Sequence, residues 1–371
     1  MIPFNKPHIT GKEVHYIYDA VASGKISGNG KYTKKCQSFF EEIWGFKKTL
    51  MTTSCTDALE MAALLLDIKP GDEVIVPAYT FVSTALAFVR QGAKIVFADS
   101  RPDHPGIDET GIEKLITPRT KVIVPVHYAG VACDMDKIMN LADKYKLWVV
   151  EDAAQAIDSY YKGQPLGRIG HLGCFSFHET KNIQCGEGGM LAINDERFMK
   201  RAEIIWEKGT NRAEFFRGEV NKYGWVDIGS SFLPSEVISA FLWAQIEDYK
   251  NIQEKRKAIW AYYYDTLFNY QTNKFSLPVI PDYATNNAHM FYIICNSEAE
   301  RIRITGNLKT NDVLAVTHYL ALNKSKFYSK IESPKDLVNC DRYESCLLRL
   351  PLYFDLDNSN LQRICKVINQ S

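Results

Sequence analysis

The stretch "FSFHETKNIQCGEGG", residues 175–189, places one lysine between an apolar, strand-like segment and a pair of glycines. Lysines are mostly solvated, because burying an ammonium group is costly, so Lys181 needs a chemical reason to lie inside. An amine in this position can form an imine with an aldehyde. Ser176, at the end of the strand-like segment, can donate a hydrogen bond to a phosphate, and glycines 186, 188 and 189 allow a tight backbone turn. We interpret His178 as a hydrogen-bonded structural histidine rather than as one that orients neighbouring groups.

Two further clusters of polar residues have both a structural and a ligand-binding interpretation. In "LWVVEDAAQA" (147–156) an apolar strand ends at Glu151 and Asp152, and a carboxylate there can cap a helix or hold a ring nitrogen protonated. In "TTSCTDALEMAALLL" (52–66) Ser54 or Thr56 can cap an apolar helix, whose N-terminus would attract phosphate. Each cluster alone has an ordinary structural explanation. Together they match the requirements of pyridoxal 5′-phosphate (PLP).

A fourth cluster, "PAYTFVSTALAF" (77–88), follows a strand-like segment and offers two aromatic side chains. Either Tyr79 or Phe81 can stack on a planar ring, or pack into the core. Taken alone, the packing interpretation is favoured.

These clusters can form a single site only if the strands that precede them belong to one sheet and end at the same edge of it. Near-continuous apolar runs at 73–79, 93–99, 120–130 and 147–150 alternate with amphipathic stretches such as 135–146. This alternation predicts an α/β fold with a mostly parallel sheet covered on both faces. Ligands bind outside the carboxyl ends of such strands.

The rest of the chain predicts a smaller unit. A long helix is expected over about 234–268, and residues 269–288 look like a linker. Beyond it, 289–295 and 312–320 are predicted as strands and 360–370 as a helix. We therefore expect a large domain at 1–268 and a small C-terminal α+β domain at 269–371.

Composition excludes several classes of protein. The 371 residues carry 44 basic and 44 acidic side chains, so the formal net charge of zero argues against nucleic-acid binding. No apolar run is long enough for a membrane span, and the N-terminus lacks a signal-peptide core. The nine scattered cysteines form no Cys-x-x-Cys pair, which favours reduced thiols in the cytoplasm and predicts no metal site.

In order along the chain, the sequence strongly resembles the DegT/DnrJ/EryC1/StrS sugar aminotransferases, which have the type I PLP-dependent (aspartate aminotransferase-like) fold. The resemblance is carried by "MIPFNKPHITGKE", "SCTDALEMAALLLDIKPGDEVIVP", "TFVSTALAF", "VPVHYAGVACDMD", "VVEDAAQA", "GCFSFHETKN", "GEGG" and "KGTNR". It implies a PLP enzyme that transfers the amino group of L-glutamate to a keto sugar nucleotide, and a homodimer with shared active sites.

The resemblance also implies roles for individual residues. It makes Lys181 the catalytic lysine that holds PLP as an imine. The implied cofactor-binding residues are Asp152 at the pyridine nitrogen, Gln155 near the ring hydroxyl, Phe81 stacked on the ring, and Cys55, Thr56 and Ser176 around the phosphate.

Two segments depart from the family pattern. Ser231 in "GSSFL" (229–233) stands where the family usually has an asparagine that reaches a phosphate across the dimer interface. A serine can still donate one hydrogen bond there. In "HYLALN" (318–323) His318 and Tyr319 are kept, but Asn323 replaces a second histidine.

Four other functions compete with this prediction. An aminotransferase acting at another sugar carbon, or giving the other amine stereochemistry, is the nearest. A PLP-dependent sugar dehydratase would have histidine in place of Lys181, and a non-catalytic regulator should have lost Lys181 or Asp152. A Rossmann dehydrogenase would need a G-x-G-x-x-G segment after a strand, which this sequence lacks.

Overall fold

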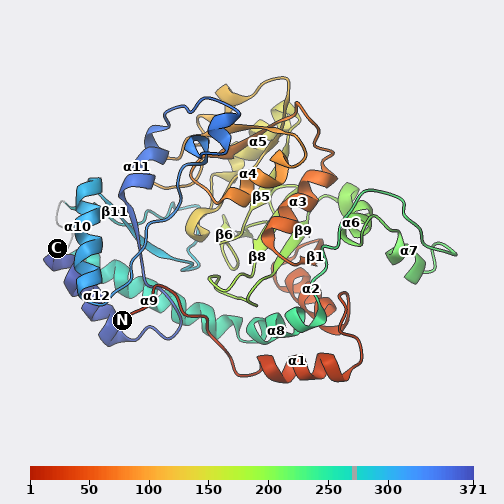
Figure 1. Cartoon of the computed structure of the whole chain (residues 1–371), viewed down its shortest axis with the longest axis horizontal. Helices are drawn as coiled ribbons and strands as arrows, with labels where there is room; N and C mark the ends of the chain where they lie inside the picture. The colour runs from red at the N-terminus through yellow and green to blue at the C-terminus, as the bar shows by residue number, and fades with distance from the viewer. Residues whose placement is uncertain (270–273) are drawn as a thin grey trace.

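A seven-stranded sheet forms the centre of the computed structural model, which describes residues 1–269 and 274–371 (Figure 1). The strand order is β1-β9-β8-β5-β4-β2-β3. Strand β9 runs antiparallel to both of its neighbours, and the remaining neighbouring pairs are parallel. The predicted mostly parallel sheet is therefore confirmed. Its strands are β1 (Lys48–Thr52), β2 (Glu73–Pro77), β3 (Lys94–Ala98), β4 (Thr120–Ile123), β5 (Trp148–Asp152), β8 (Leu172–Ser176) and β9 (Gly189–Ile193).

Helices cover both faces of this sheet, which explains why its strands are mostly apolar. Along β2, Ile75 faces one core and its neighbours Val74 and Val76 face the other. Successive strand residues point to opposite faces, so a strand buried on both sides has no polar face. The main covering helices are α2 (Lys31–Trp44), α3 (Cys55–Leu65), α4 (Val82–Val89), α5 (Met135–Tyr145) and α6 (Met199–Trp206).

A second, three-stranded antiparallel sheet follows in the C-terminal part of the chain. It consists of β10 (Phe275–Ser276), β11 (Phe291–Cys295) and β12 (Leu347–Leu350), and it packs with α10 (Glu298–Thr310), α11 (Val338–Cys346) and α12 (Asn358–Gln370). Its core also contains Ile259, Tyr263 and Leu267, from the end of the preceding helix α9. The predicted domain boundary at 268/269 adjoins residues 270–273, which lie outside the described residues, and stays a prediction.

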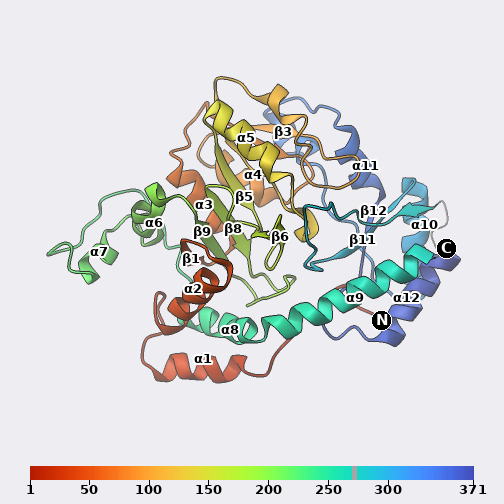
Figure 2. The same ribbon diagram turned by 180° about the vertical axis from the view of Figure 1, so that it is seen from behind.

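The predicted helix over 234–268 is two helices, α8 (Glu236–Glu247) and α9 (Tyr249–Asn269), interrupted at Asp248. In both views α9 runs from the first sheet toward the second (Figures 1 and 2). The prediction of a strand at 312–320 is wrong. Val313 and Val316 form isolated bridges, to Ile2 and Arg349, because the segment then leaves the second sheet and crosses toward the first.

The remaining elements lie at the periphery. Helix α1 (Glu13–Ala22) packs along α8, and α7 (Arg212–Phe216) extends away from the body of the molecule in both views (Figures 1 and 2). The short elements are β6 (Tyr160–Tyr161), β7 (Gln164–Pro165), η1 (Ile112–Leu115), η2 (Tyr128–Gly130), η3 (Glu196–Phe198), η4 (Leu322–Lys324) and η5 (Tyr328–Lys330). Within 1–269 and 274–371, no helix has the length and apolarity to cross a membrane.

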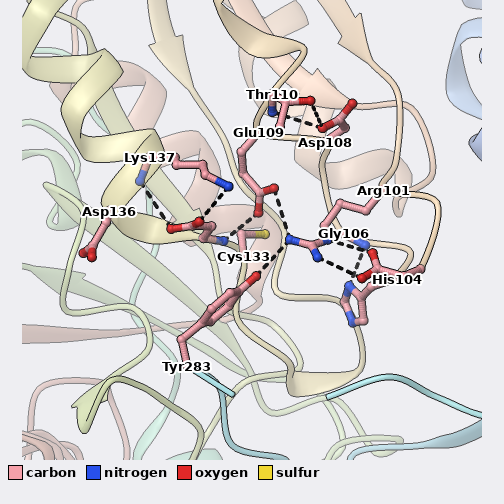
Figure 3. A network of polar contacts seen from close by, with 12 residues as sticks. Arg101, His104, Gly106, Asp108, Glu109, Thr110, Cys133, Asp136, Lys137 and Tyr283 are labelled. Carbon is pink, nitrogen blue, oxygen red and sulfur yellow. Dashed lines mark hydrogen bonds and ion pairs between the residues drawn. The ribbon is translucent and has the colours of Figure 1, made fainter. Parts of the chain in front are cut away.

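A polar network fixes the loop after β3 against the segment that leads into the second sheet (Figure 3). Arg101 donates two hydrogen bonds of 2.9 Å to Asp103 and a third of 2.9 Å to the Tyr283 hydroxyl. The buried carboxylate of Glu109 accepts from the backbone N–H of Asp134 at 2.6 Å. Burial raises the pKa of Glu109. The network therefore connects the loop after β3 to the segment that precedes the second sheet.

Candidate active site

A cavity of about 780 Å³ lies at the carboxyl ends of the parallel strands. It is bounded by loops of the first sheet, by the N-terminal segment and by β12 of the second sheet. Among the residues predicted from the sequence, the ones that line it are Cys55, Thr56, Phe81, Asp152, Gln155, Ser176 and Lys181. Ser231 does not line it.

The N-terminus of α3 forms one wall. Ser54, rather than Thr56, is the cap, and its hydroxyl accepts from the backbone N–H of Asp57 at 3.1 Å. The first N–H groups of a helix have no partner within the helix, so those of Cys55 and Thr56 are available to an anion in the cavity. The Thr56 and Ser83 hydroxyls lie 2.7 Å apart on the same wall.

A glycine lets this helix end lie directly against β9. A Cβ atom at Gly189 would come within 2.3 Å of the Ser54 carbonyl carbon and 2.5 Å of the Cys55 nitrogen. Real Cβ atoms do not approach backbone so closely, so a larger residue would push the helix end away. Ser176, paired with Gly189 across the two strands, is brought to the same wall.

Asp152, at the end of β5, is buried at 5% exposure and held by two donors. The Thr84 hydroxyl donates to Oδ2 at 2.7 Å, and the Ala154 backbone N–H donates to Oδ1 at 3.1 Å. Burial raises the pKa of Asp152, while these two hydrogen bonds and the Lys181 charge oppose the rise. An ionised carboxylate in this setting stabilises a cationic group placed against it.

Lys181 reaches the cavity from the loop between β8 and β9. Burial lowers the pKa of its ammonium, and the negative charge of Asp152 opposes that change. A lowered pKa increases the fraction of neutral amine, the form that can accept a proton or attack a carbonyl. The side chain of the next residue, Asn182, donates to the Gln253 side chain and to the Asn287 carbonyl, both at 2.8 Å, which anchors the loop.

Gln155 and Phe81 complete the predicted set. The Gln155 amide donates to the Tyr319 hydroxyl at 2.9 Å and accepts from the Ala129 N–H at 2.6 Å. Phe81 is 56% exposed, and its ring lies 6.3 Å from that of Tyr319. Tyr79 is buried in an aromatic cluster, as the packing interpretation predicted.

Other polar residues noted in the sequence lie elsewhere or act structurally. His178 lines the cavity, and its Nδ1 contacts the Thr180 hydroxyl at 3.0 Å. Asn323 is buried and donates to the Lys335 carbonyl at 2.6 Å. Ser231 is exposed and bridges to Glu207, away from the cavity lining.

Thr84, His289 and Arg349 are polar residues at the site that the sequence analysis did not identify. Thr84 donates to Asp152, and its signal was its position in the first turn of the helix that follows β2. His289 lines the cavity with its Nδ1 3.0 Å from the Asn182 side-chain oxygen, and burial lowers its pKa well below the usual range. Arg349 lines the cavity from β12. The last two come from the second sheet or the segment leading to it, and no local pattern marks them.

Comparison with known proteins identifies the family. The model of the DegT/DnrJ/EryC1/StrS aminotransferase family matches residues 7–369. The chain belongs to this family. Protein MJ1066 of Methanocaldococcus jannaschii, itself described as uncharacterized, is 31% identical over 360 residues, which cover 95% of this chain and 92% of that protein.

Solved structures agree over the whole length. The putative sugar aminotransferase Spr1654 of Streptococcus pneumoniae, in its PMP form, is 26% identical with a TM-score of 0.92, covering 100% of this chain and 98% of that one. DesV of S. venezuelae, in complex with a ketimine intermediate, is 27% identical with a TM-score of 0.90 and the same coverage. The type I PLP-dependent fold is thus confirmed.

The protein is a PLP-dependent sugar aminotransferase. The residues that line its cavity fit that cofactor. A helix N-terminus suits the phosphate, Asp152 suits a protonated ring nitrogen, and Lys181 suits the aldehyde carbon. When bound, PLP supplies the electron sink for the carbanion formed from the amino donor.

Proposed function

We propose that the protein transfers the amino group of L-glutamate to carbon 4 of dTDP-4-dehydro-6-deoxyglucose. The products are dTDP-4-amino-4,6-dideoxygalactose and 2-oxoglutarate, and the aminosugar serves surface polysaccharides such as enterobacterial common antigen or lipopolysaccharide. Support for this substrate comes from resemblance to dTDP-4-amino-4,6-dideoxygalactose transaminase. That resemblance is strongest in "SCTDALEMAALLLDIKPGDEVI", "HYAGVACDMD" and "FSFHETKN".

One observation carries the aminotransferase chemistry: Lys181, Asp152 and the N-terminus of α3 line a single cavity. We propose that the neutral Lys181 amine takes a proton from the amino-acid carbon and later returns one to the sugar carbon, as general base and then general acid. The lowered pKa of Lys181 suits this role. The volume, about 780 Å³, lies in the usual range for small-molecule sites.

The remaining roles belong to the same proposal. The backbone N–H groups of Cys55 and Thr56, with the Ser176 hydroxyl, bind the cofactor phosphate. Phe81 stacks on the cofactor ring, and Gln155 contacts the ring hydroxyl. The exposure of Phe81 on the cavity wall favours stacking over a purely structural role.

We further propose a homodimer in which Ser231 donates to the cofactor phosphate of the other subunit. Its exposure and its distance from its own chain's cavity lining suit such a role. A two-fold interface exchanges the same patch between subunits. Light scattering tests the dimer, and an active monomer would contradict it. Ser231→Ala should weaken PLP retention by about 1 kcal/mol, the worth of one neutral hydrogen bond.

A cytoplasmic location completes the proposal. All nine cysteines are free thiols, which suits a reducing compartment. Lysate fractionation tests this: the activity should appear with cytoplasmic markers.

The substrate is tested by incubating the purified holoenzyme with L-glutamate and a panel of keto sugar nucleotides, followed by NMR of the product. Ring couplings that show an axial amine at carbon 4 would support the galacto product. An equatorial amine at carbon 4 would show that the enzyme makes the gluco-configured product instead. Amination at carbon 3 would show that its substrate is a 3-keto sugar nucleotide. No product from any member of the panel would contradict the proposed reaction.

A further inference from the structure

His289 is a buried histidine of the cavity wall to which the chemistry above assigns no role. It lies two residues before β11, in the segment that leads into the second sheet. Its N–H donates to the Asn287 side-chain oxygen at 3.0 Å. Arg256 of α9 donates to the carbonyls of Ala288 and His289 at 3.2 and 2.8 Å. These contacts fix the backbone that carries the ring.

A chain of side-chain amides determines which ring nitrogen of His289 carries a proton. The Asn182 side-chain nitrogen donates at 2.8 Å to the Asn287 carbonyl, which can only accept, so the other polar atom of that amide is its oxygen. His289 Nδ1 lies 3.0 Å from this oxygen and must be the donor of the contact. Because a neutral imidazole has one N–H, Nε2 is then a hydrogen-bond acceptor.

The far end of the amide chain gives the same assignment. The Gln253 side-chain nitrogen donates to the Asp158 carboxylate at 3.2 Å, and that carboxylate also pairs with Lys257 at 3.0 Å. A carboxylate only accepts, so Gln253 presents its oxygen to Asn182, whose nitrogen donates to it at 2.8 Å. The orientation of the Asn182 amide is thus fixed by two independent acceptors.

The Nε2 atom of His289 is an acceptor without a partner. Burial lowers the pKa of His289 well below the usual range, and the positive charges of Lys181 and Arg256 lower it further, so the ring is neutral at physiological pH. Within residues 1–269 and 274–371, no group donates a hydrogen bond to Nε2. Since the residue lines the cavity, this nitrogen is available to a ligand there.

The character of this acceptor excludes most groups of the two substrates. A lone pair repels the carboxylates of an amino donor and the diphosphate of a sugar nucleotide, so its partner is a neutral N–H or O–H group. Asn182, which holds the ring, follows Lys181 in the chain, and the Lys181 charge acts on the ring, so the partner lies near the reacting carbon. L-glutamate has no hydroxyl there, whereas a keto sugar has one on the carbon beside its carbonyl.

We propose that Nε2 of His289 accepts a hydrogen bond from the hydroxyl group beside the carbonyl of the keto sugar. This inference rests on the proposed function, in which that group is the carbon-3 hydroxyl of dTDP-4-dehydro-6-deoxyglucose. His289 is then a substrate-binding residue of the second half-reaction. It selects keto sugars by this hydroxyl and does not contribute to the reaction with L-glutamate.

The test uses two variants that separate the two ring nitrogens. His289→Asn places its amide near the position of Nδ1, so it keeps the hydrogen bond to Asn182 and loses the acceptor in the cavity. His289→Gln places its amide near the position of Nε2, where it can present an oxygen. The change in cofactor absorbance follows each half-reaction separately.

The two half-reactions should respond differently. We expect kcat/KM for the keto sugar nucleotide to fall about tenfold in His289→Asn, the worth of one neutral hydrogen bond whose loss leaves a buried group unpaired. His289→Gln should lie between His289→Asn and wild type. The constants for L-glutamate should stay within about twofold in both variants, which a general distortion of the site would not allow.

An analogue that lacks the carbon-3 hydroxyl identifies the partner of Nε2. Removing the hydroxyl should lower kcat/KM about tenfold in wild type and less than about twofold in His289→Asn, because the variant has already lost the hydrogen bond. Equilibrium binding gives a second readout. In PLP-loaded Lys181→Ala, calorimetric titration with the keto sugar nucleotide should show an about tenfold higher dissociation constant once His289→Asn is added.

A matched control excludes effects of losing any histidine. His15→Asn changes an exposed histidine of α1 and should leave every value unchanged. Circular dichroism establishes that each variant is folded.

The possible failures are distinguishable. Equal losses in both half-reactions of folded His289→Asn would assign Nε2 to the Lys181 amine and overturn the inference. The same penalty for the analogue in wild type and in His289→Asn would also overturn it. If wild type aminates a different sugar nucleotide, the proposed substrate is wrong. The same comparison with that sugar then supports the inference if a hydroxyl beside its carbonyl is coupled to His289, and overturns it if none is.

Discussion

The Thr84 hydroxyl donates a 2.7 Å hydrogen bond to Oδ2 of Asp152, and thereby favours the ionised form of a buried carboxylate. This contact joins the first turn of α4 to the end of β5. It lowers the pKa of Asp152, whereas burial raises it. The charge expected beside the cofactor ring thus depends on a residue outside the family motif that contains Asp152.

Replacing Thr84 by valine should therefore impair the enzyme most at acidic pH. Without this hydrogen bond the pKa of Asp152 rises further, so less of the carboxylate is ionised at a given pH. We expect the acidic limb of the pH–kcat profile to move to higher pH and kcat at pH 7 to fall about tenfold. Thr84→Ser keeps the hydroxyl and should behave like wild type. Superimposable profiles for Thr84→Val and wild type would refute this role.

Asp152→Asn should lose activity but stabilise the apoenzyme. Removing the charge that supports the pyridinium should lower kcat at least about 100-fold. Because burial raises the folded-state pKa of Asp152, the folded protein binds this proton more tightly than the unfolded chain does. The stability due to this group is present below the unfolded pKa and is lost as pH rises through the folded pKa.

Thermal unfolding of the apoenzymes tests the sign of the stability difference between Asp152→Asn and wild type. Asp152→Asn should unfold at a higher temperature than wild type at pH 8, and the difference should shrink toward about pH 4, near the unfolded carboxyl pKa. A variant less stable than wild type at pH 8 would contradict the reasoning.

Glu151, the residue before Asp152, should be needed for stability and not for catalysis. It is fully buried and accepts backbone hydrogen bonds from Gly167 at 2.8 Å, Ile169 at 2.7 Å and Gly170 at 2.5 Å, and it lies 2.8 Å from His127 Nε2. Glu151→Gln should cost about 3 kcal/mol of unfolding free energy, because an amide N–H would face these donors. Chemical denaturation measures the loss, and the folded fraction should keep near wild-type kcat. A large loss of kcat with unchanged stability would show that Glu151 belongs to the site.

Gly189→Ala should weaken cofactor binding through the helix end it supports. A Cβ at this position would lie 2.3 Å from the Ser54 carbonyl carbon, so α3 must shift. We expect the dissociation constant of PLP, measured by titrating apoenzyme, to rise at least about tenfold, roughly the loss of one or two phosphate hydrogen bonds. Gly306→Ala, in a helix with open space around the glycine, is the matched control and should leave it unchanged. Equal dissociation constants in the two variants would argue against a phosphate site at α3.

All the residues predicted to bind the cofactor, except Ser231, line the cavity, because parallel strands bring their carboxyl ends to one edge. Asp152 and Ser176 end neighbouring strands, so a sheet edge is enough to bring them together. Arg349 could not be found this way. "LLRL" is typical of a buried strand with one polar residue, and the direction of that residue depends on how the second sheet packs on the first.

The segment at 312–320 shows that hydrophobic alternation alone does not predict a strand. Its alternating apolar residues are typical of a strand, but the chain makes only single bridges before it carries His318 and Tyr319 to the cavity. A ladder needs a neighbouring strand of matching length, and hydrophobic periodicity contains no information about that neighbour. The role proposed for Ser231 likewise requires a second subunit, about which the sequence pattern of one chain contains no information.

The central claim is that Lys181 carries the cofactor covalently and performs the proton transfers. Borohydride reduction of the holoenzyme followed by peptide mass mapping tests it most directly. We predict that the mass of reduced PLP appears on the peptide containing Lys181, and that Lys181→Ala shows no such adduct while still binding PLP noncovalently and losing turnover by orders of magnitude. An adduct on a different lysine, or full turnover in Lys181→Ala, would contradict the account.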